Sequence, residues 1–355
     1  MGLSVFMINI ENDVAMKIRE MLEQVEVNNL SEYACLSSRT KGRRVPLVKC
    51  EIRTEFQRDR DRILHSKSFR RLKDKTQVFL FPTGDHYRTR LTHTLEVSQI
   101  ARTISKSLRL NEDLTEAIAL GHDLGHTPFG HAGESAVNDV VTGGFRHNEQ
   151  SLRVVEVLER DGEGLNLTYE VRDGILRHTK GRESMMSKEN TPSTLEGHVV
   201  RVADIIAYVN HDIEDAIRAS MIQQNNLPEE YVRLVGNSHG SRIDCMVKDV
   251  IKNSLGSSEI RMSKDILYAT EGLRDYLYNE VYTRNEIIDD IRKAKKALKE
   301  LFFYFIENPQ AIPENLIKIA GDNIERAVCD YIAGMSDKMA LNKYQELFLP
   351  QPWNE

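Results

Sequence analysis

The sequence predicts an all-α protein with a helical extension at its C-terminal end. Apolar residues recur with a period of about 3.6 over most of the 355 residues, which is the spacing of amphipathic helices. No convincing set of alternating apolar and polar residues indicates a β-sheet, and no glycine-rich phosphate loop occurs. The pattern therefore favours one mainly helical unit over an α/β fold.

Eight helices are expected, at residues 91–108, 113–124, 149–159, 193–218, 271–281, 285–307, 313–319 and 323–347. The first has Leu91, Leu95, Ile100, Ile104 and Leu108 on one face. The fourth starts with a serine and a glutamate at capping-box spacing. A short extended piece at 77–81 is expected to form a hairpin, and the polar stretches 180–194 and 221–242 are expected to be loops.

The expected organisation has three parts and no Pro/Gly/Ser-rich linker. Residues 1–45 form a partly flexible N-terminal segment, 46–220 the core, and 221–355 a helical region packed on that core. A chain of this length can bury about 75% of its extended surface, so no disulfide or metal staple is needed for stability.

Composition excludes several functional classes. The 48 basic and 54 acidic residues give a formal charge of -6, so the whole chain is not attracted to nucleic acid or an anionic membrane. Four well-separated cysteines exclude a disulfide scaffold and a cysteine zinc site, and suit a reducing compartment. The sequence contains no apolar run of membrane-spanning length and no signal-peptide pattern at its start. We expect a cytoplasmic protein that does not bind membranes.

The histidines cluster where a metal site is expected. Five of the 11 lie between His93 and His147, and the second predicted helix ends in Gly-His122-Asp123-Leu-Gly-His126. Imidazole ligands suit zinc, manganese, iron and nickel, and a carboxylate extends the range to harder ions. His93 lies on the preceding predicted helix, which can carry it to the same point.

Asp204 is a fourth candidate ligand. It lies in a strongly apolar helix, where a carboxylate is costly unless it is paired or bound to a metal. Tyr208 and Asp212 follow at i+4 and i+8, so one stripe of this helix would line a cleft. The alternative interpretation is that His122 and Asp123 form a local hydrogen bond and that Arg201 neutralises Asp204. The convergence of three helices favours the metal site.

The order His93, His122-Asp123, Asp204 resembles the HD superfamily of metal-dependent phosphohydrolases. Longer segments resemble the bacterial dGTP triphosphohydrolase-like proteins over roughly residues 32 to 348. These segments are RTEFQRDRDRILHSKSFRRLKDKTQVF (53–79), DHYRTRLTHTLEVSQIARTI (85–104), GHDLGHTPFGHAGE (121–134), RHNEQS (146–151), ADIIAYVNHDIEDA (203–216) and DYIAGMSDK (330–338).

This resemblance implies an HD-domain helical fold and a role for each matching residue. The implied metal ligands are His93, His122, Asp123 and Asp204. The implied catalytic pair is His131 and Glu134. The implied substrate contacts are Gln77 at the sugar 3'-hydroxyl, Arg90, His126 and His147 at the phosphates, and Tyr208 and Asp212 on the sugar and phosphate side. One departure is Ile205, which stands where the mammalian branch has a phosphate-contacting lysine.

The resemblance further implies metal-dependent hydrolysis of dGTP or several deoxynucleoside triphosphates to deoxynucleoside and inorganic triphosphate. The resemblance also implies that the activity requires one divalent ion (Mn, Mg, Fe, Co, Ni or Zn) and that the protein forms a homo-oligomer, often a hexamer. Two alternatives stay open. One is an HD-type nucleotidase or phosphodiesterase acting on nucleoside monophosphates or nucleic-acid ends, and the other is a non-catalytic nucleotide sensor.

Two basic segments, 39–44 and 58–62, have several interpretations. Charge runs are usually solvated surface, and the alternating signs of the second segment fit salt-bridged helix packing. A functional interpretation is an allosteric site for a regulatory nucleotide. Binding of single-stranded nucleic acid by the same segments is a further alternative.

Overall fold

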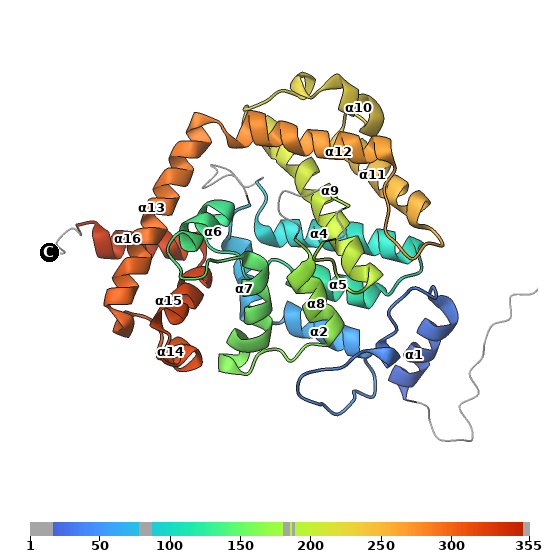
Figure 1. Ribbon diagram of the computed structural model, residues 1–355, viewed down its shortest axis with the longest axis horizontal. Coiled ribbons are helices and arrows are strands. Elements are labelled where there is room, and N and C mark those ends of the chain that lie inside the picture. Colours follow the sequence, from blue (N-terminus) through green and yellow to red (C-terminus); the bar gives the residue numbers. More distant parts are fainter. Residues whose placement is uncertain (1–16, 78–86, 180–184, 187–188, 351–355) are drawn as a thin grey trace, which may run out of the picture.

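The computed structural model describes residues 17–77, 87–179, 185–186 and 189–350. Within these residues all regular secondary structure is helical. Strand-like pairing is limited to two isolated bridges, Arg43 with Thr168 and Thr76 with Thr89. The all-α prediction is therefore confirmed (Figure 1). Of the hairpin expected at 77–81, Gln77 lies in a bend, and the rest lies outside the described residues.

The α-helices of the described residues are α1 (Ile18–Asn29), α2 (Glu55–Leu64), α3 (Lys67–Arg71), α4 (Arg90–Ser107), α5 (Glu112–Gly121), α6 (Gly130–Asn138), α7 (His147–Arg153), α8 (Tyr169–Arg177), α9 (Leu195–Arg218), α10 (Glu229–Val235), α11 (His239–Ser254), α12 (Lys264–Leu277), α13 (Asn285–Glu307), α14 (Glu314–Ala320), α15 (Ile324–Ala333) and α16 (Asp337–Phe348). Two π-helical segments, Val154–Leu158 and Tyr278–Tyr282, follow α7 and α12.

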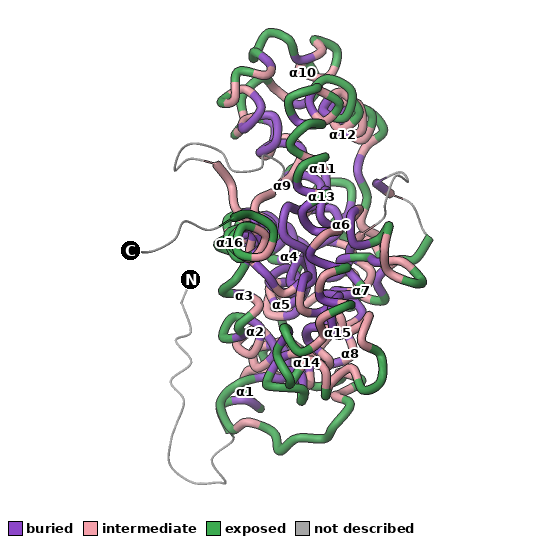
Figure 2. The backbone as a smooth tube through the Cα atoms, turned by 90° about the vertical axis from the view of Figure 1, so that its left-hand side faces the viewer, coloured by how far each residue is buried: buried purple, intermediate pink, exposed green. Residues whose placement is uncertain are grey.

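A large apolar core forms where α4, α5 and α9 pack on one another. Helix α4 begins with Thr89, whose side chain accepts a hydrogen bond from the Thr92 amide, and it buries Val97, Ile100 and Ile104. Leu95, which was expected on the buried face of this helix, is half exposed. The buried face of α4 therefore differs from the one expected. Figure 2 shows the buried residues gathered in the middle of the molecule, with exposed stretches toward α10 and α1.

A second apolar core joins α6 to the C-terminal helices. Phe129, immediately before α6, shares it with Leu301 and Phe305 of α13 and with Ile332 of α15. Helix α13 runs from the α12 end of the molecule to the α14–α16 end (Figure 1). The C-terminal region thus packs on the core through two clusters, while the boundaries expected at 45 and 220 stay predictions.

Two expectations for the C-terminal helical region, residues 221–355, are wrong. The single helix expected at 323–347 is two helices, α15 and α16, because Ser336 accepts a hydrogen bond from the Met339 amide and so caps a new helix. The loop expected at 221–242 contains α10 and the start of α11. Pro228 precedes α10, and Ser238 forms a capping box with Ser241, so these polar residues are helix starts.

Other helices differ in extent or were not expected. Helix α12 starts at Lys264, before the expected 271, and the helix expected at 149–159 is α7 followed by a π-helical segment. Helices α1, α2, α3, α6 and α8 had no counterpart among the expected elements. In the described parts of 180–194 no helix forms before α9, as expected. No helix within the described ranges is long and apolar enough to span a membrane.

Candidate metal centre

Three helices bring His93, His122, Asp123 and Asp204 together. His93 lies one turn into α4, His122 and Asp123 follow α5 directly, and Asp204 lies in the middle of α9. His93, His122 and Asp123 are buried, whereas the side chain of Asp204 is 22% exposed. Because α4, α5 and α9 pack on one another, residues far apart in the sequence reach one point.

The turn that carries His122 and Asp123 is fixed from outside. A Cβ atom at Gly125 would lie 2.1 Å from the backbone nitrogen of Ser151, so only glycine lets the turn approach α7 this closely. The Ser151 hydroxyl donates to the carbonyl of His122 (2.7 Å) and accepts from the amide of Gly125 (2.8 Å). These contacts hold the His-Asp pair in place against α7.

The ligand atoms of the four residues converge. His93 Nε2 lies 3.1 Å from Asp204 Oδ1, and His122 Nε2 lies 3.3 Å from Asp123 Oδ1 and 3.9 Å from Asp204 Oδ1. The described ion pairs of Asp204 are thus with imidazoles, so the structure does not support its neutralisation by Arg201. The ligand atoms of His93, His122 and Asp204 lie within 4.8 Å of one another, close enough to hold one ion, and those of Asp123, His126 and His147 form a second such group.

The tautomer of His122 tests whether a cation fits here. Its Nδ1 lies 2.7 Å from the carbonyl oxygen of Ala119, which can only accept, so Nδ1 carries the hydrogen. Nε2 is then the ring nitrogen whose lone pair could bind a metal; it faces two carboxylates and has no hydrogen-bond partner among the described residues. A lone pair and carboxylate oxygens suit a divalent cation between them.

Both carboxylates remain ionised. Burial by itself raises the pKa of Asp204 and of Asp123, but the neighbouring imidazoles outweigh it and leave both values well below the ordinary range. Burial is also the main reason that the pKa of His93 is lowered. Two carboxylates beside two imidazoles therefore make a site that favours a positive ion.

A second group adjoins the first through Asp123. His126 Nε2 lies 3.2 Å from Asp123 Oδ1, and the His126 ring stacks on that of His147 with centroids 3.9 Å apart. Burial, with the charge of Arg90, holds the pKa of His126 well below its usual range. Arg90 donates from Nη1 to Asp123 Oδ2 (2.8 Å), while its buried Nε and Nη2 have no partner among the described residues.

Glu134 joins two of the predicted histidines. Its Oε1 lies 2.9 Å from His147 Nδ1, and its Oε2 lies 3.4 Å from His131 Nδ1. Burial alone would raise the pKa of Glu134, but His147, His131 and His126 together hold it far below its usual value. The His131 side chain is 75% exposed, whereas that of His147 is 11% exposed. One anionic carboxylate thus serves an outer and an inner imidazole.

The remaining predicted residues lie around this centre. Gln77 approaches it through Gly130, where a Cβ atom would lie 2.7 Å from the Gln77 carbonyl oxygen and 3.0 Å from Arg90 Nη2. On α9, Tyr208 is partly buried one turn beyond Asp204. Asp212, one turn further, accepts a hydrogen bond from the hydroxyl of Tyr282.

Two histidines of this region were missed by sequence reasoning. His178 follows α8, stacks edge-on against His122 with centroids 5.0 Å apart, and has Nε2 3.2 Å from His147 Nε2. His211 packs edge-on against His93, between Glu96 and Asp212. A signal existed for His211, because it follows Asp204 by two helical turns on the same helix. His178 had none, since α8 was not expected.

Comparison with known proteins decides the family. Residues 90–209 match the HD domain, and residues 260–346 match the phosphohydrolase-associated domain. A deoxyguanosinetriphosphate triphosphohydrolase-like protein of Caldanaerobacter subterraneus subsp. tengcongensis is 58% identical over 341 residues, covering 96% of this chain and 98% of the relative. The chain belongs to this family of HD-domain phosphohydrolases.

Further relatives agree. The triphosphohydrolase-like protein of Desulfatibacillum aliphaticivorans is 51% identical over 95% of this chain and 99% of its own length. A solved phosphohydrolase from Bacteroides thetaiotaomicron shares the fold, with a TM-score of 0.51 at 17% identity over 81% of this chain and 69% of that one. The HD-domain match spans all four converging residues, from His93 to Asp204.

Proposed function

We propose that this phosphohydrolase cleaves deoxynucleoside triphosphates, dGTP or several of them, into deoxynucleoside and inorganic triphosphate. The observation that carries the proposal is the lone pair of His122 Nε2, aimed at two ionised carboxylates inside an HD domain. Close relatives named triphosphohydrolase-like support the substrate class over the whole chain.

His93, His122, Asp123 and Asp204 would hold one divalent metal ion. When bound, such an ion supplies Lewis-acid polarisation of a phosphoryl oxygen and lowers the pKa of water. Manganese, magnesium, iron, cobalt, nickel and zinc all fit two imidazoles and two carboxylates. Arg90 holds Asp123 from its other side, and this contact fixes the orientation of one ligand.

His131 would donate the proton that the leaving group needs. Release of intact triphosphate joins the oxygen of water to the α-phosphorus and breaks the bond from that phosphorus to the 5'-oxygen, which then takes up a proton. Because His131 turns Nδ1 toward Glu134, its Nε2 is left for the exposed side, where a substrate arrives. Glu134 would stabilise the protonated imidazole before transfer.

Arg90, His126 and His147 would bind the phosphates. Nε and Nη2 of Arg90 are buried without a partner among the described residues, so both can donate to an anion, and Nδ1 of His126, which also lacks a partner there, would do so when the ring is protonated. Guanidinium groups pair strongly with phosphate oxygens. Gln77 would contact the sugar 3'-hydroxyl from beside Gly130, and Tyr208 and Asp212 would approach the sugar and phosphates from α9.

The association state, regulation and compartment are further parts of the proposal. A homo-oligomer, with a hexamer as the expected form, a regulatory nucleotide and a cytoplasmic location stay predictions. Family membership supports a nucleotide substrate.

Substitution of one ligand tests the metal assignment. His122→Ala and, separately, Asp123→Ala should lose bound metal and hydrolysis together, because each removes a donor atom from the centre. His239→Ala, a partly exposed histidine on α11, is the matched control and should keep both. Full metal occupancy in either ligand variant contradicts the assignment.

A further inference from the structure

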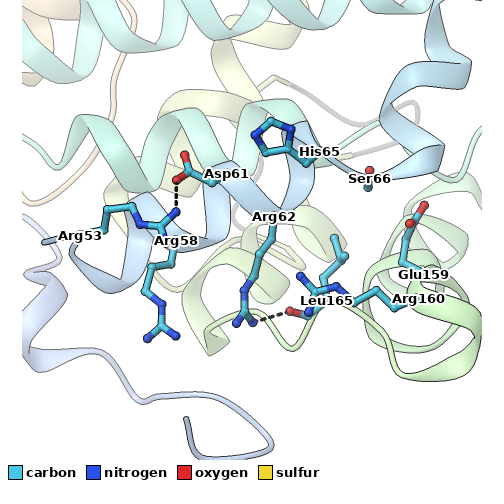
Figure 3. Close-up of a pocket in the computed structure, with 9 residues that line it drawn as sticks. All are labelled: Arg53, Arg58, Asp61, Arg62, His65, Ser66, Glu159, Arg160 and Leu165. Carbon is cyan, nitrogen blue, oxygen red and sulfur yellow. Dashed lines mark hydrogen bonds and ion pairs between the residues drawn. The ribbon is translucent and has the colours of Figure 1, made fainter. Parts of the chain in front are cut away.

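A cavity of about 360 Å³ opens between α2 and the chain that follows the first π-helical segment. Its walls include Arg53, Arg58 and Arg62 from one side and Glu159 and Arg160 from the other (Figure 3). None of the proposed catalytic or metal-binding residues lines it. Its volume lies within the range of small-molecule sites.

Positive charge prevails in this cavity. Four arginines and two carboxylates line it, and both carboxylates already have partners. Asp61 accepts from Arg53 (2.7 Å), which Figure 3 shows as a dashed line. Glu159 accepts from the backbone amide and hydroxyl of Ser68, at 2.7 and 2.6 Å. Arg53 therefore matches the charge of Asp61, whereas Glu159 keeps its charge but forms no ion pair with an arginine within the described residues.

Arg62 is held in place without an anionic partner among the described residues. Its Nη1 donates to the backbone carbonyls of Leu165 (2.7 Å) and Asn166 (3.1 Å), which are neutral acceptors. Burial, together with the positive charges of Arg43 and Arg160, lowers the pKa of Arg62 to about 10. The guanidinium thus stays charged at neutral pH, and it forms no ion pair within the described residues.

The neighbouring charges on α2 behave differently. Asp59 pairs with Arg43, and Arg60 pairs with Asp113 (2.9 Å) and Glu116 (3.4 Å) of α5. These pairs confirm the salt-bridged packing expected for 58–62. Arg62 is the exception, so its unmatched charge is not a general property of this helix.

Arg160 adds a second unmatched guanidinium. No ion pair or hydrogen bond of its side chain is found within the described residues, and in Figure 3 it extends toward Leu165 and the end of Arg62. Its backbone is left-handed (φ 55°, ψ 42°), as is that of Asp161, and neither residue is glycine. Strained backbone of this kind is found at ligand-binding positions.

We propose that this cavity is a second anion site, which binds a small polyphosphate, either free or carried by a nucleotide. Guanidinium forks match phosphate oxygens in geometry, and a chain of phosphates can contact Arg62 and Arg160 at once. A ligand with a single carboxylate would bring only one negative charge for the two guanidinium groups. The formal charge of -6 and the small volume argue against an extended nucleic acid as the occupant.

Calorimetric titration of the full chain with inorganic triphosphate in the presence of a chelator tests the site. Arg160→Gln, at an exposed position, should weaken binding at least about tenfold, because a charge-assisted contact is lost. Arg62→Lys keeps the charge but removes the fork, so binding should weaken less. Arg292→Gln, on the exposed face of α13, is the matched control and should bind as the unmodified chain does.

The His122→Ala variant distinguishes triphosphate binding at the metal centre from binding in this cavity. Triphosphate binding that persists in His122→Ala and is lost in Arg160→Gln supports the cavity, whether or not the proposed hydrolysis holds. Binding that is lost in His122→Ala and unchanged in Arg160→Gln overturns it, as does an absence of binding at millimolar triphosphate. A parallel titration with a nucleoside triphosphate shows whether the nucleoside increases the affinity over that of inorganic triphosphate. If the nucleotide binds in this cavity, Arg160→Gln should remove that increase.

Discussion

Glu134 Oε1 lies 2.9 Å from His147 Nδ1, closer than the 3.4 Å that separates Oε2 of the same carboxylate from His131 Nδ1. The backbone amide of His147 also donates to this Oε1, at 2.8 Å. Glu134 therefore fixes the start of α7 and one face of the inner histidine, in addition to its proposed partnership with His131. Loss of its charge would disturb two imidazoles.

His131→Ala should keep bound metal and substrate affinity but lose turnover. A general acid typically contributes about 10²–10⁴ in rate, so kcat should fall by a factor in that range. Glu134→Gln should lose at least as much, since it affects His131 and His147 together. Single-turnover kinetics with metal analysis measures both.

The double variant separates joint from independent action. His131→Ala with Glu134→Gln should be little slower than Glu134→Gln alone, because residues that act as one unit are not additive. Fully additive losses indicate that the two side chains act independently. An unchanged rate in His131→Ala assigns the acid role to another group, with His126 as the next candidate.

Tyr208→Phe should raise the KM for the substrate about 2–10-fold, the effect of one lost neutral hydrogen bond, while metal content stays the same. The hydroxyl lies one turn beyond Asp204, and burial raises its pKa, so it remains a neutral donor. Tyr268→Phe, at an exposed position on α12, is the control. Loss of metal from Tyr208→Phe would show instead that this residue supports the ligand helix.

Gly125→Ala should destabilise the protein by about 1–3 kcal/mol, the usual effect of overpacking. Its added Cβ would meet the backbone of Ser151 and Gln150 at 2.1 and 2.4 Å, and backbone cannot move aside as a side chain can. Chemical denaturation measures the change. Gly240→Ala on α11, where the new methyl group meets nothing within 4 Å, should be neutral or stabilising. Equal stability of the two variants would contradict the tight approach of α7.

Glu196 should make stability fall as the pH rises. Burial raises its pKa from 4.5 to about 7 in the folded chain. Between these values the unfolded chain has released the proton that the folded chain still binds, so the free energy of unfolding decreases, by up to about 3 kcal/mol, and levels off above pH 7. Glu196→Gln carries no such proton and should lack this part of the decrease.

Denaturation at pH 5, 6, 7 and 8 measures the difference between the two proteins. The acceptor oxygen that binds the Cys35 and Asn111 amides, at 2.9 and 3.0 Å, is available in glutamine too, which makes the variant a fair comparison. Parallel pH profiles would show that Glu196 ionises normally in the folded chain.

Local patterns were sufficient to predict three of the longest helices, α4, α9 and α13, but not α11. In α4 and α9 the apolar period extends over many residues, so their existence and approximate ends follow from sequence. Helix α2 was missed because its buried face includes Glu55 and Asp59, and the ion-pair partner of Asp59 is Arg43, a residue outside the helix. Such non-local ion pairs leave no periodic signal.

The convergence of the candidate metal ligands was predictable to a similar degree. Asp204 was evident as a carboxylate in an apolar helix, and the His122-Asp123 pair as adjacent ligand types at a helix end. The placement of His178 depends on the packing of α7 against α8, which no local pattern encodes. The shared role of Glu134 likewise depends on where α7 starts relative to α6.

Product analysis tests the central claim most directly. Each of the four deoxynucleoside triphosphates, alone and mixed, is incubated with the full chain and Mg²⁺, Mn²⁺ or Co²⁺. The phosphate products are resolved by ³¹P NMR and the nucleosides by liquid chromatography. The account predicts deoxynucleoside and intact inorganic triphosphate in equal amounts, and neither product from His122→Ala. Orthophosphate or pyrophosphate as the primary product, or tight binding of every nucleotide without turnover under any of these metals, would contradict it.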